Sequence, residues 1–157
     1  MFVLLRQLDL VRRAAALRRP DRARSLAVRH VDAGSCNACE HELTAASNPH
    51  YDLQRFGIDI VASPRHADVL LITGPVTEHM REPLLAAYAA MPEPRLVAAL
   101  GDCALGRGVL GSADAIAGAV EDILPIDIRI PGCPPAPDKI ADRLLEALEA
   151  GAHLRAR

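Results

Sequence analysis

The stretch Ala67-Asp68-Val69-Leu70-Leu71-Ile72-Thr73-Gly74-Pro75 is the most informative guide to the fold. Its middle is almost continuously apolar, which is typical of a strand buried on both faces of a parallel sheet. Gly74-Pro75 ends this strand. Residues 78–90 follow with apolar side chains at helical spacing, so the strand is expected to lead into a helix.

Strands and helices are expected to alternate along the rest of the chain. The sequence predicts four further strands, at residues 25–31, 56–62, 96–100 and 126–130. It predicts three further helices, at residues 40–46, 112–124 (with Ser112-Ala113-Asp114 as the cap) and 138–150. This alternation indicates an α/β domain over residues 25–151, with a parallel sheet between two layers of helices. In such doubly wound sheets, ligands bind beyond the carboxyl ends of the strands.

The composition narrows the class of protein. Half of the 157 residues are hydrophobic, yet there are only two Phe, two Tyr and no Trp. So few rings argue against stacking on nucleic-acid bases and leave little to sandwich a flavin. No apolar run approaches the roughly 18–20 residues that span a bilayer, and neither Arg12-Arg13 nor Arg18-Arg19 precedes the apolar segment of an export signal. The sequence favours one cytoplasmic domain with no nucleic-acid partner.

Residues 1–24 are expected to form an amphipathic basic helix and a linker. Residues 3–17 place apolar side chains on one stripe and arginines opposite it. Residues 1–30 carry eight Arg and two Asp, a net charge of +6, so the remainder carries −8. This helix is expected either to cover the domain's own core or to lie against a membrane protein or lipid surface. Residues 152–157 are expected to be a short tail.

All four cysteines follow expected strands. Cys36-x2-Cys39 comes after the first strand, Cys103 after the fourth and Cys133 after the fifth. Because these strand ends meet at one edge of a parallel sheet, the four thiols are expected to converge on one metal centre. A glycine within two residues before each group leaves room for inorganic sulfide and lets backbone N–H groups approach it, and a proline follows the last cysteine as in ferredoxin-type runs. These residues are Gly34, Gly101, Gly132 and Pro134.

Other uses of four cysteines remain open at this point. Structural zinc usually takes two close ligand pairs, but here the second pair, Cys103 and Cys133, is widely separated. A thioredoxin-like dithiol at Cys36 and Cys39 would leave the other two cysteines without a role. Disulfides need an oxidising compartment, for which the sequence gives no sign. An iron–sulfur cluster therefore leads, ahead of a zinc-stabilised scaffold.

The segment Gly106-Arg107-Gly108-Val109-Leu110-Gly111 matches the Gly-x-Gly-x-x-Gly pattern of dinucleotide-binding loops. However, the preceding strand ends several residues earlier and Cys103 intervenes. No acidic residue stands at the end of the next strand to contact a ribose. These glycines are instead expected to let the loop wrap closely around a cluster or a partner.

The cysteine motifs together resemble the small, cluster-bearing subunit shared by NiFe hydrogenases and respiratory complex I. The resemblance covers residues 26–150 and is carried by Cys36-Asn37-Ala38-Cys39-Glu40-His41-Glu42, Thr73-Gly74-Pro75-Val76-Thr77, Gly101-Asp102-Cys103 and Pro131-Gly132-Cys133-Pro134-Pro135. It implies a flavodoxin-like domain in which Cys36, Cys39, Cys103 and Cys133 ligate one 4Fe-4S cluster. The Cys-x2-Cys spacing is similar to the membrane-bound hydrogenase branch, including formate hydrogenlyase, whereas complex I members have adjacent cysteines.

The resemblance also implies a role and partners. The chain would be an electron-transfer subunit, peripheral on the cytoplasmic face of the cell membrane. It would bind a large hydrogenase-like or 49 kDa-like subunit, a ferredoxin-like subunit and integral membrane subunits. The alternative within the family is a complex I-like subunit that passes electrons to quinone. Residues expected at the cluster or at the subunit interface are Gly34, Glu40, His41, Glu42, Gly74, Thr77, Gly101, Gly132 and Pro134.

Glu40, His41 and Glu42 have two possible roles each. The carboxylates of Glu40 and Glu42 are expected either to be solvated at the start of the helix or to serve proton movement at the subunit boundary. His41 is expected either to be an exposed histidine or to couple protonation to reduction of the cluster.

Overall fold

The computed structural model describes residues 25–110 and 114–151. A five-stranded sheet forms its centre, with the strand order β2-β1-β3-β5-β7. Every neighbouring pair in this sheet is parallel. Counting only these five strands, the order is 2-1-3-4-5, which is the flavodoxin-like arrangement and confirms the predicted fold class. The strands are β1 (Leu26–Asp32), β2 (Ile58–Ile60), β3 (Val69–Thr73), β5 (Leu96–Leu100) and β7 (Ile128–Ile130).

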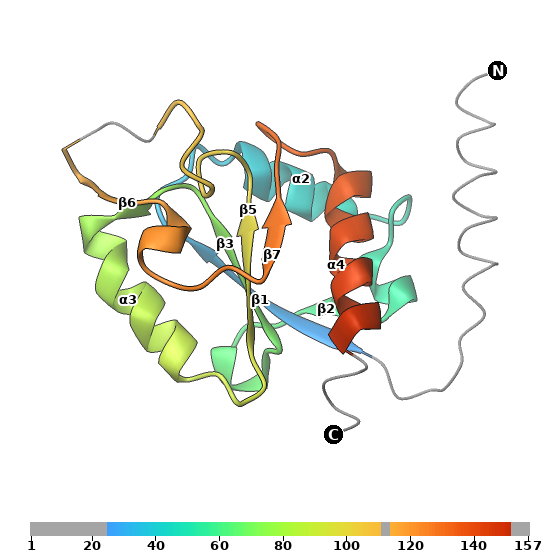
Figure 1. Cartoon of the computed structure of the whole chain (residues 1–157). Helices are drawn as coiled ribbons and strands as arrows, with labels where there is room; N and C mark the ends of the chain where they lie inside the picture. The colour runs from blue at the N-terminus through green and yellow to red at the C-terminus, as the bar shows by residue number, and fades with distance from the viewer. Residues whose placement is uncertain (1–24, 111–113, 152–157) are drawn as a thin grey trace, which may run out of the picture.

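Strand β3 is the centre of the sheet, with β1 on one side and β5 on the other (Figure 1). All five of its residues are buried. Val69 and Leu71 pack into one hydrophobic cluster, whereas Leu70 and Ile72 pack into a second cluster on the opposite face. Because both faces are covered, neither set of alternate positions needs a polar residue. This explains the continuous apolar run in the sequence.

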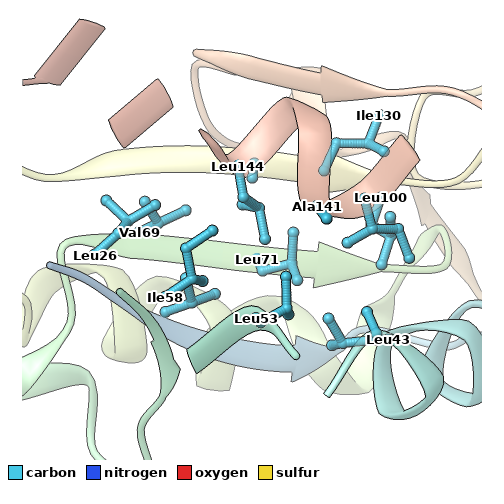
Figure 2. Packing of buried hydrophobic residues seen from close by; sticks show 14 residues of the cluster. Leu26, Leu43, Leu53, Ile58, Val69, Leu71, Leu100, Ile130, Ala141 and Leu144 are labelled. Atoms are coloured by element: carbon cyan, nitrogen blue, oxygen red, sulfur yellow. The ribbon is translucent and has the colours of Figure 1, made fainter. Parts of the chain in front are cut away.

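The first cluster lies between the sheet and two helices, α2 (Ala38–Ala46) and α4 (Pro137–Gly151). Figure 2 shows Ala141 and Leu144 of α4, together with Leu43 of α2, gathered around Leu71 of the sheet. The short 3-10 helix η1 (Leu53–Phe56) adds Leu53. Cys39 packs against the same cluster, so the helix that covers this face also carries a candidate ligand.

The second cluster lies under α3 (Glu78–Ala89), on the opposite face of the sheet (Figure 1). Leu84 of α3 is fully buried there. The loop that follows β5 contributes Ala104 and Leu105, and Val120 of the 3-10 helix η3 (Val120–Asp122) completes the cover. A further 3-10 turn, η2 (Pro64–His66), precedes β3. Two helical layers therefore enclose the sheet, as predicted.

The helix predicted over residues 112–124 is wrong for the part that the structure describes. The segment forms β6 (Ile116–Gly118), which pairs antiparallel with β4 (Val76–Thr77), and then η3. Gly118 has a φ of +150°, which interrupts a helix, and the Asp122 carboxylate accepts a hydrogen bond from Ala119 N at 2.8 Å. The backbone N–H of Glu78 also donates a hydrogen bond to Ala115 O at 2.9 Å. These contacts hold the segment extended against the start of α3.

Several predictions concern residues outside the described part. The amphipathic helix and linker at 1–24, the tail at 152–157 and the proposed cap residues Ser112 and Ala113 all lie outside it. The expected division of the chain at these points remains a prediction. Within residues 25–110 and 114–151, no helix has the length and apolar character needed to cross a bilayer.

Truncating one buried side chain of the central strand tests the packing of the core. Leu71 is fully buried, so Leu71→Ala is expected to lower the free energy of unfolding by about 2–5 kcal/mol, because it leaves a cavity between α4 and the sheet. Ile60 is 43% exposed, so Ile60→Ala is the control and should cost about 1 kcal/mol or less. Chemical denaturation of the full chain measures both. Equal losses would contradict the packing.

Candidate metal centre

All four cysteines lie at the carboxyl edge of the sheet, as predicted. Cys36 is in the loop after β1, and Cys39 is in the first turn of α2. Cys103 and Cys133 follow β5 and β7. All four are free thiols; Cys36 and Cys133 are exposed, and Cys39 and Cys103 are half-buried. Three loops therefore contribute thiols from one edge, and one side of the group stays open to solvent.

The electrostatics of Cys39 show how close the thiols are. Burial, followed by the charges of Glu40, Cys36, Cys103 and Cys133, raises the pKa of Cys39 to about 12. The other three cysteines therefore all lie within electrostatic range of this sulfur. At neutral pH the Cys39 thiol stays protonated in the metal-free chain, and a metal would have to displace that proton in order to bind.

The thiols are not arranged for a single ion. Among the described residues, no group of three or more His, Cys, Asp or Glu side chains is placed to hold one metal ion.

Two glycines let the backbone lie directly against the sulfurs. A Cβ atom built on Gly101 would lie 2.5 Å from Cys39 Sγ, and one built on Gly108 would collide with Cys103 Sγ and its backbone. Any side chain at either position would push a candidate ligand aside. Gly101 was predicted as part of the cluster environment. Gly108 was not, but it lies directly against Cys103. That its loop wraps closely around a cluster or a partner stays a prediction.

The loop that carries Cys36 is held by its own turn. Asp32 Oδ1 accepts hydrogen bonds from Gly34 N at 2.9 Å and Ser35 N at 2.8 Å. Burial of the Asp32 carboxylate acts to raise its pKa, but these N–H groups, the Ser35 side chain and nearby His30 outweigh burial, so the pKa is lowered. The carboxylate therefore stays ionised and fixes the entry to the loop.

Gly34, Gly74 and Thr77, all predicted at the site, interlock. A Cβ on Gly34, whose φ is +136°, would collide with the Thr77 side chain. A Cβ on Gly74 would lie 2.5 Å from Ser35 N. Thr77 also donates from its backbone N and from its hydroxyl to Ala33 O, at 2.9 and 3.1 Å. The segment after β3 is thereby locked against the Cys36 loop.

A buried polar chain beneath α2 was not predicted. The Thr73 hydroxyl, fully buried, donates to Glu40 Oε1, so its oxygen must accept from His30 Nε2 at 2.9 Å. Burial lowers the pKa of His30, although the charges of Glu40 and Asp32 oppose this. The hydrogen-bonded chain of Glu40, Thr73 and His30 ties the first turn of α2, which contains Cys39, to β1 and β3. Thr73 is the one polar residue of the otherwise apolar strand β3, but nothing in the local sequence indicates its partners.

The remaining predicted residues lie at the surface of the same edge. His41 is exposed on α2 and Glu42 is half-buried beside it. Pro134 is exposed next to Cys133, and Gly132 is half-buried before it. Glu40 departs from the expected solvated carboxylate, because its Oε2 atom is buried and has no hydrogen-bond partner among the residues that the structure describes.

The fold and the cysteines at this edge fit a subunit of an oxidoreductase complex, which is the class that the sequence comparison identifies. Residues 36–147 match the family model described as NADH ubiquinone oxidoreductase, 20 Kd subunit. The chain belongs to this family, which confirms the resemblance seen in the cysteine motifs.

Two relatives and one solved structure define the similarity further. The chain is 44% identical over 126 residues to the probable membrane-bound hydrogenase subunit mbhJ of Pyrococcus furiosus. The aligned residues cover 80% of this chain and 75% of mbhJ. It is 46% identical over 114 residues to formate hydrogenlyase subunit 7 of Escherichia coli, covering 73% of this chain and 45% of that protein. It also matches a chain of the membrane-bound sulfane sulfur reductase, an archaeal respiratory membrane complex, with a TM-score of 0.69, 32% identity and coverage of 83% and 73%.

Removing one hydroxyl tests the buried chain. Thr73→Val keeps the shape of the side chain but leaves His30 and Glu40 without their shared partner, so the free energy of unfolding should fall by about 1–3 kcal/mol. Thr44→Val, on the exposed face of α2, is the matched control and should change little. Denaturation of the full chain measures both, and a Thr73→Val chain as stable as the control would refute the role of the hydroxyl.

Alkylation tests the electrostatics of the thiols. In the metal-free chain near pH 8, iodoacetamide should label exposed Cys36 and Cys133 at least about tenfold faster than Cys39, whose raised pKa leaves little thiolate. Fragment mass spectrometry locates the label. In denaturant all four should react alike, which is the control. Rapid labelling of Cys39 in the folded chain would contradict its environment.

Proposed function

We propose that this chain is the electron-transfer subunit of a membrane-associated, multi-subunit oxidoreductase, and that Cys36, Cys39, Cys103 and Cys133 hold one 4Fe-4S cluster. The observation that carries the proposal is the convergence of four free thiols, from three loops, at one edge of the sheet. Membership of a family of oxidoreductase subunits supports it.

The surroundings of the thiols favour a cluster over a single zinc ion. A set of four sulfur ligands suits either centre. At Gly101 and Gly108 the backbone lies directly against the sulfurs of Cys39 and Cys103, which supports a centre whose sulfurs are closely approached by backbone groups. When bound, a 4Fe-4S cluster supplies a one-electron carrier whose potential depends on burial, nearby charge and hydrogen bonds.

The residues of this chain would set the position and environment of that carrier. The Asp32 turn, the Gly34–Thr77 interlock and the Thr73–Glu40 hydrogen bond hold the segment from Cys36 to Cys39 in place. Half-burial of Cys39 and Cys103 shields one side of the group from water. No side chain here would break a bond of the substrate, so catalysis belongs to a partner chain.

The open side of the centre is where a partner would dock. Cys36, Cys133 and Pro134 are exposed there, together with His41. A large hydrogenase-like or 49 kDa-like subunit covering this side would exclude water from the cluster and receive or deliver electrons. Ferredoxin-like and integral membrane subunits would complete the complex and hold this chain peripherally at the cytoplasmic face of the membrane. His41, Glu42 and Glu40 would lie at or behind that boundary.

The hydrogenase-like assignment leads over the alternatives. The identities of 44% and 46% are to subunits named for a membrane-bound hydrogenase and for formate hydrogenlyase. The family description instead names an NADH ubiquinone oxidoreductase, which keeps a complex I-like subunit as the second candidate. The sulfane sulfur reductase shares this fold at 32% identity, so the substrate of the whole complex depends on the large subunit.

The test uses the complex purified without oxygen. We expect about four irons attributable to this subunit and an electron paramagnetic resonance signal on reduction that Cys103→Ala removes. Val109→Ala, an exposed substitution in the neighbouring loop, should leave the signal unchanged. Nickel in the same sample would favour the hydrogenase form over the quinone-reducing form.

One outcome would overturn the electron-transfer role. If the complex is colourless, contains one zinc per copy of this chain and gives no signal on reduction, the zinc-stabilised scaffold replaces it.

A further inference from the structure

The loops that carry Cys103 and Cys133 are joined beyond the ends of their strands. Strands β5 and β7 pair as far as Leu100 and Ile130. Gly101 N then donates to Ile130 O at 2.8 Å, and Asp102 N donates to Gly132 O at 2.8 Å. The two backbones therefore stay hydrogen-bonded up to the residue before each cysteine, although the donors advance by one residue and the acceptors by two.

The Asp102 side chain completes this connection. Its Oδ1 atom accepts a hydrogen bond from Gly132 N at 2.9 Å. Asp102 and Gly132 thus exchange two hydrogen bonds, one through backbone atoms alone and one through the carboxylate. Each partner immediately precedes a cysteine, so this pair of bonds, the Asp102–Gly132 clasp, directly relates the backbones that carry Cys103 and Cys133.

Asp102 also holds the glycine loop that packs on Cys103. Its backbone oxygen accepts from Arg107 N at 2.8 Å, and Gly106 N donates to Cys103 O at 3.1 Å. Gly108 then lies directly against Cys103. The N–H and the carboxylate of Asp102 therefore both hold Gly132, while its C=O holds the glycine loop.

The Cys133 loop offers few other ways to be held. Pro131, Pro134 and Pro135 have no backbone N–H, so Gly132 and Cys133 are the only donors between residues 131 and 135. Gly132 has a φ of +143°, and a Cβ there would lie 2.7 Å from Pro135 Cα, so the turn is tightly folded. The Asp102 carboxylate accepts one of the two available donors.

We propose that Asp102 is a positioning residue: through the clasp with Gly132, its carboxylate fixes Cys103 relative to Cys133 and so controls how firmly the centre keeps its metal. The inference rests on the proposed function, because it takes both cysteines as ligands. Asn keeps an oxygen at Oδ1 that can accept from Gly132 N, whereas Ala does not. Asp102→Asn should therefore preserve the clasp, and Asp102→Ala should break it.

The first measurement reads the clasp without reference to the metal. Hydrogen exchange of the purified complex, followed by mass spectrometry, reports residues 131–135 through only two amides. In the unaltered complex the Gly132 amide should exchange slowly. Exchange should be at least about fivefold faster in Asp102→Ala but not in Asp102→Asn. Asp59→Ala, an exposed carboxylate on β2, is the matched control.

The second measurement reads the effect on the centre. Loss of metal to a chelator should be at least about tenfold faster in Asp102→Ala than in the unaltered complex, and its paramagnetic line shape should change. Asp102→Asn should lose its metal as slowly as the unaltered complex and should keep the same line shape. Because it removes a negative charge, it should raise the midpoint potential of the cluster.

Three results would overturn the positioning role. The first is fast Gly132 exchange in the unaltered complex, which can be read even if Asp102→Ala does not assemble. The second is metal loss in Asp102→Asn as fast as in Asp102→Ala. The third is fast Gly132 exchange in Asp102→Ala, which shows that the clasp is broken, together with an unchanged rate of metal loss. Failure of the proposed function would look different, since the complex would then hold zinc or no metal while the Gly132 exchange still reported the clasp.

Discussion

The close approach of the loops at the carboxyl edge depends on the burial of β3. Strand β3 is covered on both faces, and β1 and β5 both pair with it along its whole length. The loops that follow β1 and β5 therefore lie side by side. The contact between Gly74 and the backbone of Ser35 then needs a residue without a side chain, as does the contact between Gly101 and Cys39. Hydrophobic burial sets where the strands end, and glycine sets how closely the loops meet.

This closeness has an electrostatic cost. Burial of Cys39, together with the charges of Glu40, Cys36, Cys103 and Cys133, raises the pKa of its thiol and disfavours the thiolate. Polar contacts hold the arrangement despite this. The Asp32 turn and the His30–Thr73–Glu40 hydrogen bonds fix the segments of Cys36 and Cys39 to the sheet, and the Asp102–Gly132 clasp joins the segments of Cys103 and Cys133. A metal that binds here would have to displace the Cys39 proton.

The sequence predicted the parts of this structure that follow from local patterns. Apolar runs gave the five strands of the sheet, and the cysteines after them indicated the edge. The helix over 112–124 was wrong because pairing with β4 and the backbone of Gly118 outweighed local helix propensity. His30, Thr73 and Asp102 were missed for a related reason: their partners lie 30 or more residues away, and no short-range pattern encodes such contacts.

The most direct test of the account is anomalous X-ray diffraction from crystals of the intact complex, measured on either side of the iron and zinc absorption edges. We predict iron peaks, and no zinc peak, bonded to the sulfurs of Cys36, Cys39, Cys103 and Cys133. A single zinc peak at this edge of the sheet, or an iron centre that leaves any of the four cysteines unbound, would contradict the account.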